Sequence, residues 1–235
     1  MKINYQKKLD RLIAYHQSKG EVPTLLLHSC CAPCSSYCIE YLSNYFKITV
    51  LYFNPNIGEK SEYLKRRDEQ KKLISKMKTK YEVKFIDGDY NPQDFYDAVQ
   101  GFENEPERGK RCAICFALRL NYTGKVAEQI GADYFATTLT LSPLKNAHLI
   151  NEIGKNIKCK SQYLCTDFKK KEGYKRSIEL SKEFELYRQN YCGCIFSKRN
   201  RKWIYSTYWK CKCYFSKREI WINSGLILIS KCKKK

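Results

Sequence analysis

Residues 25–34, LLLHSCCAPC, form a short apolar run that ends abruptly at paired thiols. An apolar run of this length, bounded by a turn signal, predicts a buried strand. In open parallel α/β sheets, ligands bind beyond the carboxyl ends of the strands. We therefore expect a functional site at Cys30 and Cys31, directly after this strand.

The paired thiols also have a simpler interpretation, because a buried free cysteine is more often a small core residue than a ligand. Neighbouring side chains of a regular strand point to opposite faces, so Cys30 and Cys31 can act on one centre only if the chain turns there. Pro33 supplies such a turn, since it disfavours helical geometry at Ala32 and suits the first turn of a helix. With Cys34 three residues on, the pair is the first candidate site.

Strand and helix patterns alternate along the chain. Strands are predicted at 24–28, 46–53, 81–87, 132–138 and 161–164, and helices at 3–19, 35–44, 61–79, 111–130, 146–156 and 175–187. Such alternation indicates an α/β fold with a mainly parallel sheet and helices on both faces.

Composition narrows the class of protein. The 235 residues are 43% apolar, which is enough for a sizeable core. No apolar run is long enough to span a bilayer and residues 1–20 lack the apolar region of a signal peptide, so we expect a cytoplasmic protein with no membrane partner. In that compartment the 13 cysteines favour metal binding or thiol redox chemistry over a disulfide framework.

Positive charge is concentrated toward the C-terminus. Residues 169–235 hold 19 Lys and Arg against 5 Glu, a balance of +14 out of the chain's +20. We expect an α/β domain at 1–197 and a basic, aromatic-rich extension at 198–235. Interleaved cations and aromatic rings suit nucleic acid binding, and a solvated tail is the equal alternative.

Two further thiol motifs follow. Cys112 and Cys115 are spaced to share one face near a helix N-terminus, which favours thiolate, and this spacing is typical of zinc and iron–sulfur ligands. Cys192 and Cys194 flank Gly193, and a disulfide across so small a ring is strained and easily reduced. That pair suits an electron relay, with metal ligation as the alternative.

The cysteines Cys30, Cys31, Cys112 and Cys115 can surround one metal centre if their loops meet in the fold. Zinc and a [4Fe–4S] cluster both accept four thiolates. Adjacent ligands strain a single tetrahedral zinc, whereas a cluster spreads them over different irons, so the pattern favours iron–sulfur. Separately, the hydroxyl-rich loop 137–142 is either a cradle for a polar substrate or, as we favour, a helix cap.

Four segments together resemble the QueH-type epoxyqueuosine reductases: 30–34 (CCAPC) after an apolar strand, 101–120 (GFENEPERGKRCAICFALRL), 137–154 (TTLTLSPLKNAHLINEIG) and 177–197 (SIELSKEFELYRQNYCGCIFS). The resemblance implies a Rossmann-like fold related to the adenine-nucleotide α-hydrolase group. It also implies reduction of epoxyqueuosine, at the wobble position of tRNA, to queuosine in the last step of queuosine biosynthesis. Family chains end soon after the CGC segment, so the resemblance assigns no role to residues 198–235.

The resemblance also implies roles for particular residues. Cys192 and Cys194 would form a redox-active disulfide, and Cys34 lies where the family places a residue near a further metal, an additional iron ion. The partners implied are a tRNA carrying epoxyqueuosine and an external electron donor. The ligands of the [4Fe–4S] cluster would be Cys30, Cys31, Cys112 and Cys115.

We hypothesise that a metal ion polarises the epoxide oxygen as a Lewis acid while the cluster and the dithiol supply electrons. His28 and Asp167 are candidate proton donors only through their proximity in sequence to the thiols. The main alternative is a zinc-stabilised RNA-binding module without redox activity. An ATP-pyrophosphatase activity lacks support, because the first strand is followed by thiols rather than by a Ser-Gly-Gly phosphate loop.

Overall fold

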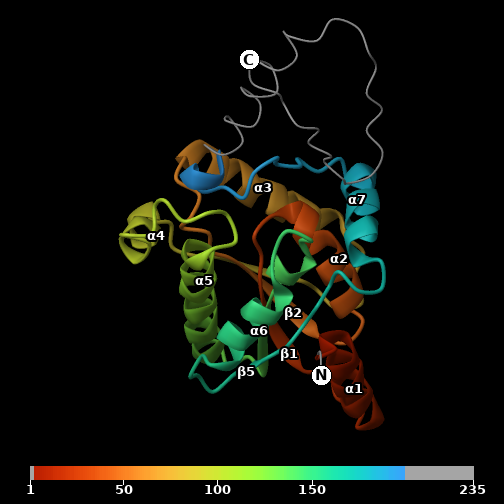
Figure 1. Cartoon of the computed structure of the whole chain (residues 1–235). Coiled ribbons are helices and arrows are strands. Elements are labelled where there is room, and N and C mark those ends of the chain that lie inside the picture. Colours follow the sequence, from red (N-terminus) through yellow and green to blue (C-terminus); the bar gives the residue numbers. More distant parts are fainter. Residues whose placement is uncertain (1–2, 199–235) are drawn as a thin grey trace, which may run out of the picture. The chain divides into compact units, whose positions relative to one another are not determined.

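A sheet of five parallel strands lies at the centre of the protein, in the order β3-β2-β1-β4-β5 (Figure 1). The structure, a computed structural model, describes residues 3–198. The strands are β1 (Thr24–His28), β2 (Lys47–Tyr52), β3 (Lys84–Asp87), β4 (Tyr134–Thr137) and β5 (Gln162–Tyr163).

The strand order is that of a Rossmann-like sheet. Leu25 of β1 lies opposite Ile48 of β2 on one side and Tyr134 of β4 on the other, so β1 is the central strand. The chain builds outward from β1 through β2 to β3, and then returns to add β4 and β5. The order therefore reverses between β1 and β4, and their carboxyl ends flank the crevice where such folds bind ligands.

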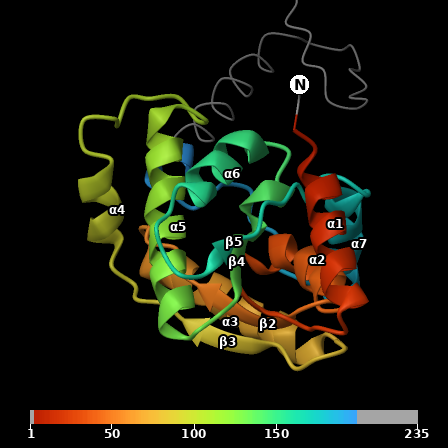
Figure 2. The ribbon, with the colours of Figure 1, turned by 90° about the horizontal axis from the view of Figure 1, so that it is seen from below.

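Helices cover both faces of the sheet. One face carries α1 (Tyr5–Ser18), α2 (Ala32–Leu42), α3 (Lys60–Lys76) and α7 (Gly173–Glu183), and the other carries α5 (Lys110–Gln129) and α6 (Ala147–Lys155). Figure 2 shows α5 on one side and α1, α2 and α7 on the other. The short helix α4 (Pro92–Ala98) packs against α5, and the 3₁₀ turn η1 (Thr138–Leu141) follows β4.

The alternation of side chains along β1 explains the two cores. Leu25 and Leu27 pack into the cluster beneath α1, α2 and α7, whereas Leu26 packs into the cluster beneath α5 and α6. Successive residues of a strand face opposite sides, so an unbroken apolar run suits only a strand covered twice. Each fully buried leucine stabilises the fold by about 1.5–3 kcal/mol relative to an exposed one.

The structure confirms the predicted α/β class, the parallel sheet and the helices on both faces. Several boundaries differ by one to four residues. Among them, α2 begins at Ala32 rather than at residue 35, β3 begins at Lys84 rather than at 81, and α7 covers Gly173–Glu183 rather than 175–187. The early start of α2 follows from Pro33, which occupies the first helical turn. Apart from Lys198, the predicted extension lies outside the described residues.

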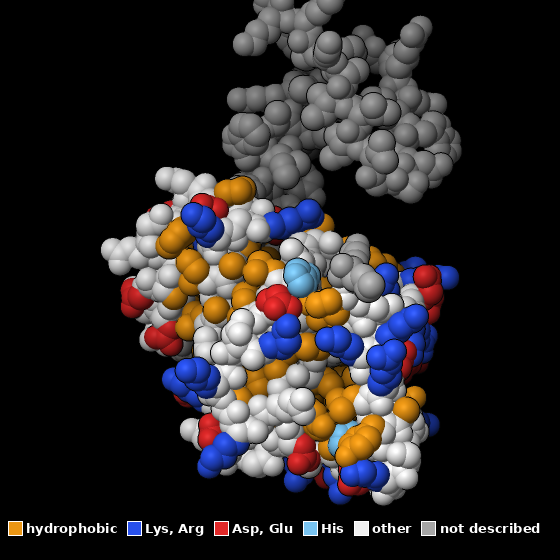
Figure 3. Space-filling model, turned by 60° about the horizontal axis from the view of Figure 1, so that its bottom comes forward, with side chains coloured by type: hydrophobic (Ala, Val, Ile, Leu, Met, Phe, Trp, Pro, Cys, Tyr) orange, Lys and Arg blue, Asp and Glu red, His pale blue; other side chains and the backbone are white. Residues whose placement is uncertain are grey.

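Surface charge on the described part of the chain is mixed. Figure 3 shows Lys and Arg side chains spread over one face, with Asp and Glu among them. Within residues 3–198, no helix is long and apolar enough to cross a membrane.

We expect Asp133→Asn to destabilise the fold, because this carboxylate ties β4 to β1. It accepts hydrogen bonds from the backbone nitrogen of Thr24 (2.8 Å) and from its hydroxyl (2.7 Å). These bonds lower the pKa of Asp133 below its usual 3.8. The free energy of unfolding should fall by about 1 kcal/mol at neutral pH, which is less than for a buried hydrogen bond to a charged group because Asp133 is exposed to water.

The effect has a definite pH dependence. A lowered pKa gives stabilisation that is complete above the unfolded-state pKa near 3.8 and is lost as the pH falls through the folded-state value. Urea unfolding of both proteins at pH 7 and pH 3 should show the gap shrinking at the lower pH. An equal gap at both pH values would contradict this role for Asp133.

Candidate metal centre

Three thiols converge at the carboxyl end of β1. The sulfur atoms of Cys30 and Cys31 are 3.8 Å apart, and those two and the sulfur of Cys34 all lie within 4.8 Å of one another. Cys31 is the N-cap of α2, so the chain turns at this point, as Pro33 predicted. Among the described residues this is the one group of three or more such side chains that could hold a metal ion.

The loop after β4 supports this thiol group. The backbone nitrogen of Cys30 donates a hydrogen bond to the hydroxyl of Thr138 (3.3 Å). That hydroxyl in turn donates to the sulfur of Cys30 (3.5 Å). The hydroxyl of Thr137 accepts from the backbone nitrogen of Leu139, as a cap does. These hydroxyls are engaged within the protein, which favours the cap interpretation of loop 137–142.

The other two thiol motifs are electrostatic neighbours of each other. Burial, together with the charges of Cys192 and Cys194, raises the pKa of Cys112 and raises that of Cys115 to about 12. The expected thiolate preference at this helix N-terminus is thus outweighed by desolvation. Neither Cys112 nor Cys115 joins the group within 4.8 Å at the end of β1.

Two buried or half-buried cations interact electrostatically with the thiol motifs. Arg119, one turn after Cys115 on α5, has only 1% of its surface exposed, and Lys145 lies half-buried between η1 and α6. Burial lowers the pKa of both side chains, but the charges of Cys192 and Cys30 more than offset it, so both values are raised. The anionic groups with the largest effect on the two cations are thiolates, and none is a carboxylate.

This donor set fits a metal–thiolate centre. Thiolates bind zinc and iron–sulfur clusters, and a centre with four thiolate ligands carries net negative charge that nearby cations balance. Arg119 also has a buried terminal nitrogen, Nη2, with no hydrogen-bond partner in the described structure. The site therefore offers thiols as ligands and positive charge for the anion that they form.

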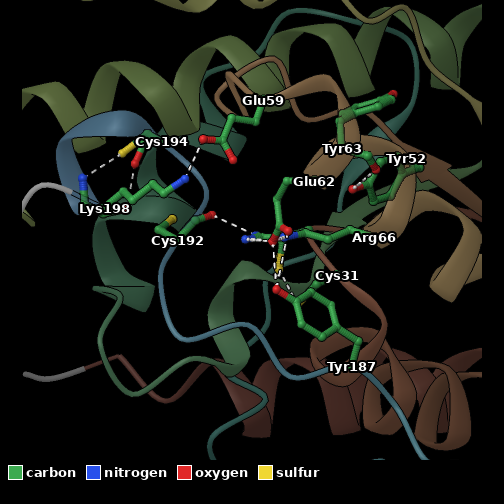
Figure 4. A network of polar contacts seen from close by, with 12 residues as sticks. Cys31, Tyr52, Glu59, Glu62, Tyr63, Arg66, Tyr187, Cys192, Cys194 and Lys198 are labelled. Atoms are coloured by element: carbon green, nitrogen blue, oxygen red, sulfur yellow. Dashed lines mark hydrogen bonds and ion pairs between the residues drawn. The ribbon is translucent and has the colours of Figure 1, made fainter. Parts of the chain in front are cut away.

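The CGC motif lies in a strap, defined here as residues 187–198, that side chains of α3 hold in place (Figure 4). Arg66 donates to the carbonyl of Cys192 (3.3 Å) and pairs with Glu62 (2.6 Å), which also accepts from the hydroxyl of Tyr187 (3.2 Å). The sulfur of Cys194 accepts from the backbone nitrogen of Ser197 (3.4 Å). Both cysteines are free thiols here.

Both candidate proton donors are engaged with other groups of the protein. His28 is fully buried, and its ring nitrogens bond to the Thr137 hydroxyl (2.9 Å) and to the Phe53 carbonyl (3.0 Å). Burial lowers its pKa to about 4, so the ring is neutral and structural at neutral pH. Asp167 forms an ion pair with Lys169 (2.6 Å).

Three functional candidates were not predicted from the sequence: Arg119, Lys145 and Arg66. Arg119 does carry a sequence signal, because it falls on the buried stripe of α5 with Phe116 and Leu120. A basic residue on an apolar helical stripe is unusual enough to single out. Arg66 contacts Cys192, which is distant in the sequence, and Lys145 is affected by the charges of Cys192, Cys30 and Cys34. No local sequence pattern predicts either relation.

We expect Gly193→Ala to loosen the strap. Gly193 has φ +116°, and a Cβ there would lie 2.8 Å from Cγ1 of Ile57 and 3.1 Å from Nη1 of Arg66. Strain of this kind costs about 1–3 kcal/mol. A thiol reagent should therefore label Cys192 and Cys194 faster in the variant.

Gly131→Ala is the matched control. Gly131 also has positive φ (+65°), but nothing lies within 4 Å of its added Cβ, and it lies in the turn before β4. It should leave the labelling rate unchanged. Equal labelling of the wild type and Gly193→Ala would show that the contacts around Gly193 do not hold the strap.

Comparison with known proteins gives one consistent family. The family model described as "Epoxyqueuosine reductase QueH" matches residues 25–200. A protein of that name from Staphylococcus epidermidis is 46% identical over 202 residues, which cover 83% of this chain and 85% of the relative. Another from Thermotoga maritima is 35% identical over 187 residues, covering 76% of this chain and 92% of the relative.

Among solved structures, the U34-tRNA thiolase NcsA from Methanococcus maripaludis with its [4Fe-4S] cluster is similar at a TM-score of 0.45. The sequence identity is 14%, over 82% of this chain and 68% of that chain. So distant a similarity says nothing about the site.

Proposed function

This chain belongs to the epoxyqueuosine reductase QueH family, and on that premise we propose that its three thiol motifs form the redox centre of the enzyme. It is an epoxyqueuosine reductase, which removes the epoxide oxygen of epoxyqueuosine to give queuosine. The observation that carries the redox assignment is the convergence of Cys30, Cys31 and Cys34 at the topological switch point. Family membership does not favour the zinc-stabilised RNA-binding alternative.

The reaction consumes two electrons and two protons for each epoxide. Both C–O bonds of the ring break, a carbon–carbon double bond forms, and the oxygen leaves as water. Oxidation of two thiols to a disulfide releases two electrons and two protons, which balances this reduction. We propose that Cys192 and Cys194 are that dithiol and that an external electron donor reduces the disulfide afterwards.

We propose that Cys30, Cys31, Cys112 and Cys115 hold a [4Fe–4S] cluster, and that Cys34 serves an additional iron ion beside it. When bound, the cluster would supply single electrons and the iron ion would polarise the epoxide oxygen. The short sulfur distances around Cys34 support its part in this assignment. The electrostatic coupling of Cys115 to Cys112 and Cys192 supports a common centre for the motifs.

The chain's own residues would organise the site. Arg66 and Glu62 hold the strap so that the dithiol stays beside α5. Lys145 is half-buried, and the charges of Cys192, Cys30 and Cys34 outweigh its burial and raise its pKa, so it would supply positive charge for an oxygen that gains negative charge as the epoxide opens. Thr138 fixes the turn at Cys30.

The substrate is proposed to be the modified nucleoside within tRNA. The positive charge of the chain, +20 overall, suits a polyanion. We propose that the domain at 1–197 carries the chemistry and that the extension at 198–235 adds affinity for the phosphates. We also propose a cytoplasmic location, because thiolate chemistry needs a reducing compartment.

We expect Cys112→Ala to abolish cluster binding and turnover, because one of four ligands is lost. Anaerobically reconstituted protein should be assayed for iron, sulfide and reduction of epoxyqueuosine in tRNA. Cys159→Ala is the matched control, since that half-buried thiol donates to the Ser161 carbonyl near β5 and lies outside the motifs. An active Cys112→Ala protein with a full cluster would overturn the ligand assignment.

The dithiol is tested separately by Cys192→Ser and Cys194→Ser. Each variant should keep the iron and sulfide content of the wild type yet lose turnover, because serine cannot form the disulfide. Cys165→Ser, at a half-buried thiol just beyond β5, should behave like the wild type. Loss of the cluster in either strap variant would reassign that cysteine as a ligand, and undiminished turnover would remove the dithiol from the reaction.

A further inference from the structure

We propose that Arg119 is the fixed counter-charge of the thiolate centre and raises the reduction potential of the cluster bound there. The inference rests on the proposed function and deepens it by naming a positioning residue for the centre. Arg119 belongs to none of the thiol motifs, and its role follows from where its guanidinium is buried.

An arginine is rarely buried without a counter-ion. Removing a cation from water costs several kcal/mol unless charge or hydrogen bonds compensate for it. Arg119 is 1% exposed, and in the described structure its Nη2 atom bonds to nothing. The other fully buried arginine, Arg66, forms an ion pair with Glu62 (2.6 Å), whereas Arg119 forms none with the described residues.

A hydrogen bond from its Nε atom to the Cys115 carbonyl (3.3 Å) places the guanidinium of Arg119 beside the thiol motifs. Those of Cys115, Cys192 and Cys30 are the groups whose negative charge acts most strongly on Arg119, and they come from all three thiol motifs. Burying a guanidinium at this point is energetically unfavourable while the thiols are neutral. It becomes favourable once the thiols are deprotonated by metal binding, since the centre then carries negative charge.

The side chain also joins the two ligand loops. Its Nε atom donates to the carbonyl of Cys115 (3.3 Å), and Nη1 donates to the side-chain oxygen of Asn54 (3.4 Å). Asn54 in turn donates to the carbonyl of Ser29 (2.9 Å), the residue before Cys30. The guanidinium is therefore held between α5 and the end of β1.

A fixed positive charge has a predictable effect on redox chemistry. Adding an electron makes the centre more negative, so a nearby cation stabilises the reduced state more than the oxidised state. Removing the cation should make reduction harder. Burial strengthens the effect, because little water is present to screen it.

The test compares Arg119→Lys, which keeps the charge, with Arg119→Met, which removes it and keeps much of the volume. Both proteins are reconstituted anaerobically, and the cluster potential is measured by a reductive titration followed by electron paramagnetic resonance. Arg176→Met is the control, because Arg176 pairs with Glu40 on the outer side of α2 and is 38% exposed. Thermal unfolding of each protein checks that it is folded.

We expect the equilibrium constant for one-electron reduction to fall at least tenfold in Arg119→Met, about 59 mV for a one-electron couple. Arg119→Lys should remain closer to the wild type, and Arg176→Met should equal it. If the lysine and methionine variants behave alike, whether both keep the wild-type potential or both lose the cluster, charge at residue 119 is irrelevant and the inference fails. A wild-type protein that holds no cluster would instead overturn the proposed cofactor.

Discussion

The parallel pairing of β1 with β4 is the constraint on which the site depends. It runs from Leu25 opposite Tyr134 to His28 opposite Thr137, and it brings two carboxyl ends together at the switch point of the sheet. Buried His28 then bonds to Thr137 and to the Phe53 carbonyl, which locks the ends of three neighbouring strands. The thiols of Cys30 and Cys31 thus follow a strand end that is tied to its two neighbours, as a preorganised site requires.

The pKa values of Cys30, Cys31 and Cys34 differ because the three thiols contact one another. Hydrogen bonds from Cys31 and Cys34 hold the pKa of Cys30 well below its usual value, while the same contacts raise the values of both partners. A thiolate at one of three thiols this close disfavours ionisation of the other two, whereas a bound metal would allow all of them to ionise. The cations Arg119 and Lys145 add positive charge, which suits an anionic metal–thiolate centre.

Much of this could be predicted from the sequence, because the relevant signals are local. Apolar runs specify buried parallel strands, and Pro33 marks the turn that lets Cys30 and Cys31 face one centre. Contacts between distant segments could not be predicted in this way. The hydrogen bond from Arg66 to the carbonyl of Cys192 joins residues that are 126 positions apart in the sequence. Desolvation of Cys112 and Cys115 outweighs the helix N-terminus, and only the packing around α5 reveals that balance.

The central claim is that the clustered cysteines hold iron and sulfide rather than zinc. The most direct measurement is the metal and sulfide content of the anaerobically purified, reconstituted protein, with its visible spectrum. The account predicts a brown protein with broad charge-transfer absorption and at least four irons and four sulfides per chain, as a [4Fe–4S] cluster requires. A colourless protein with one zinc per chain and no sulfide, even after reconstitution, would contradict it.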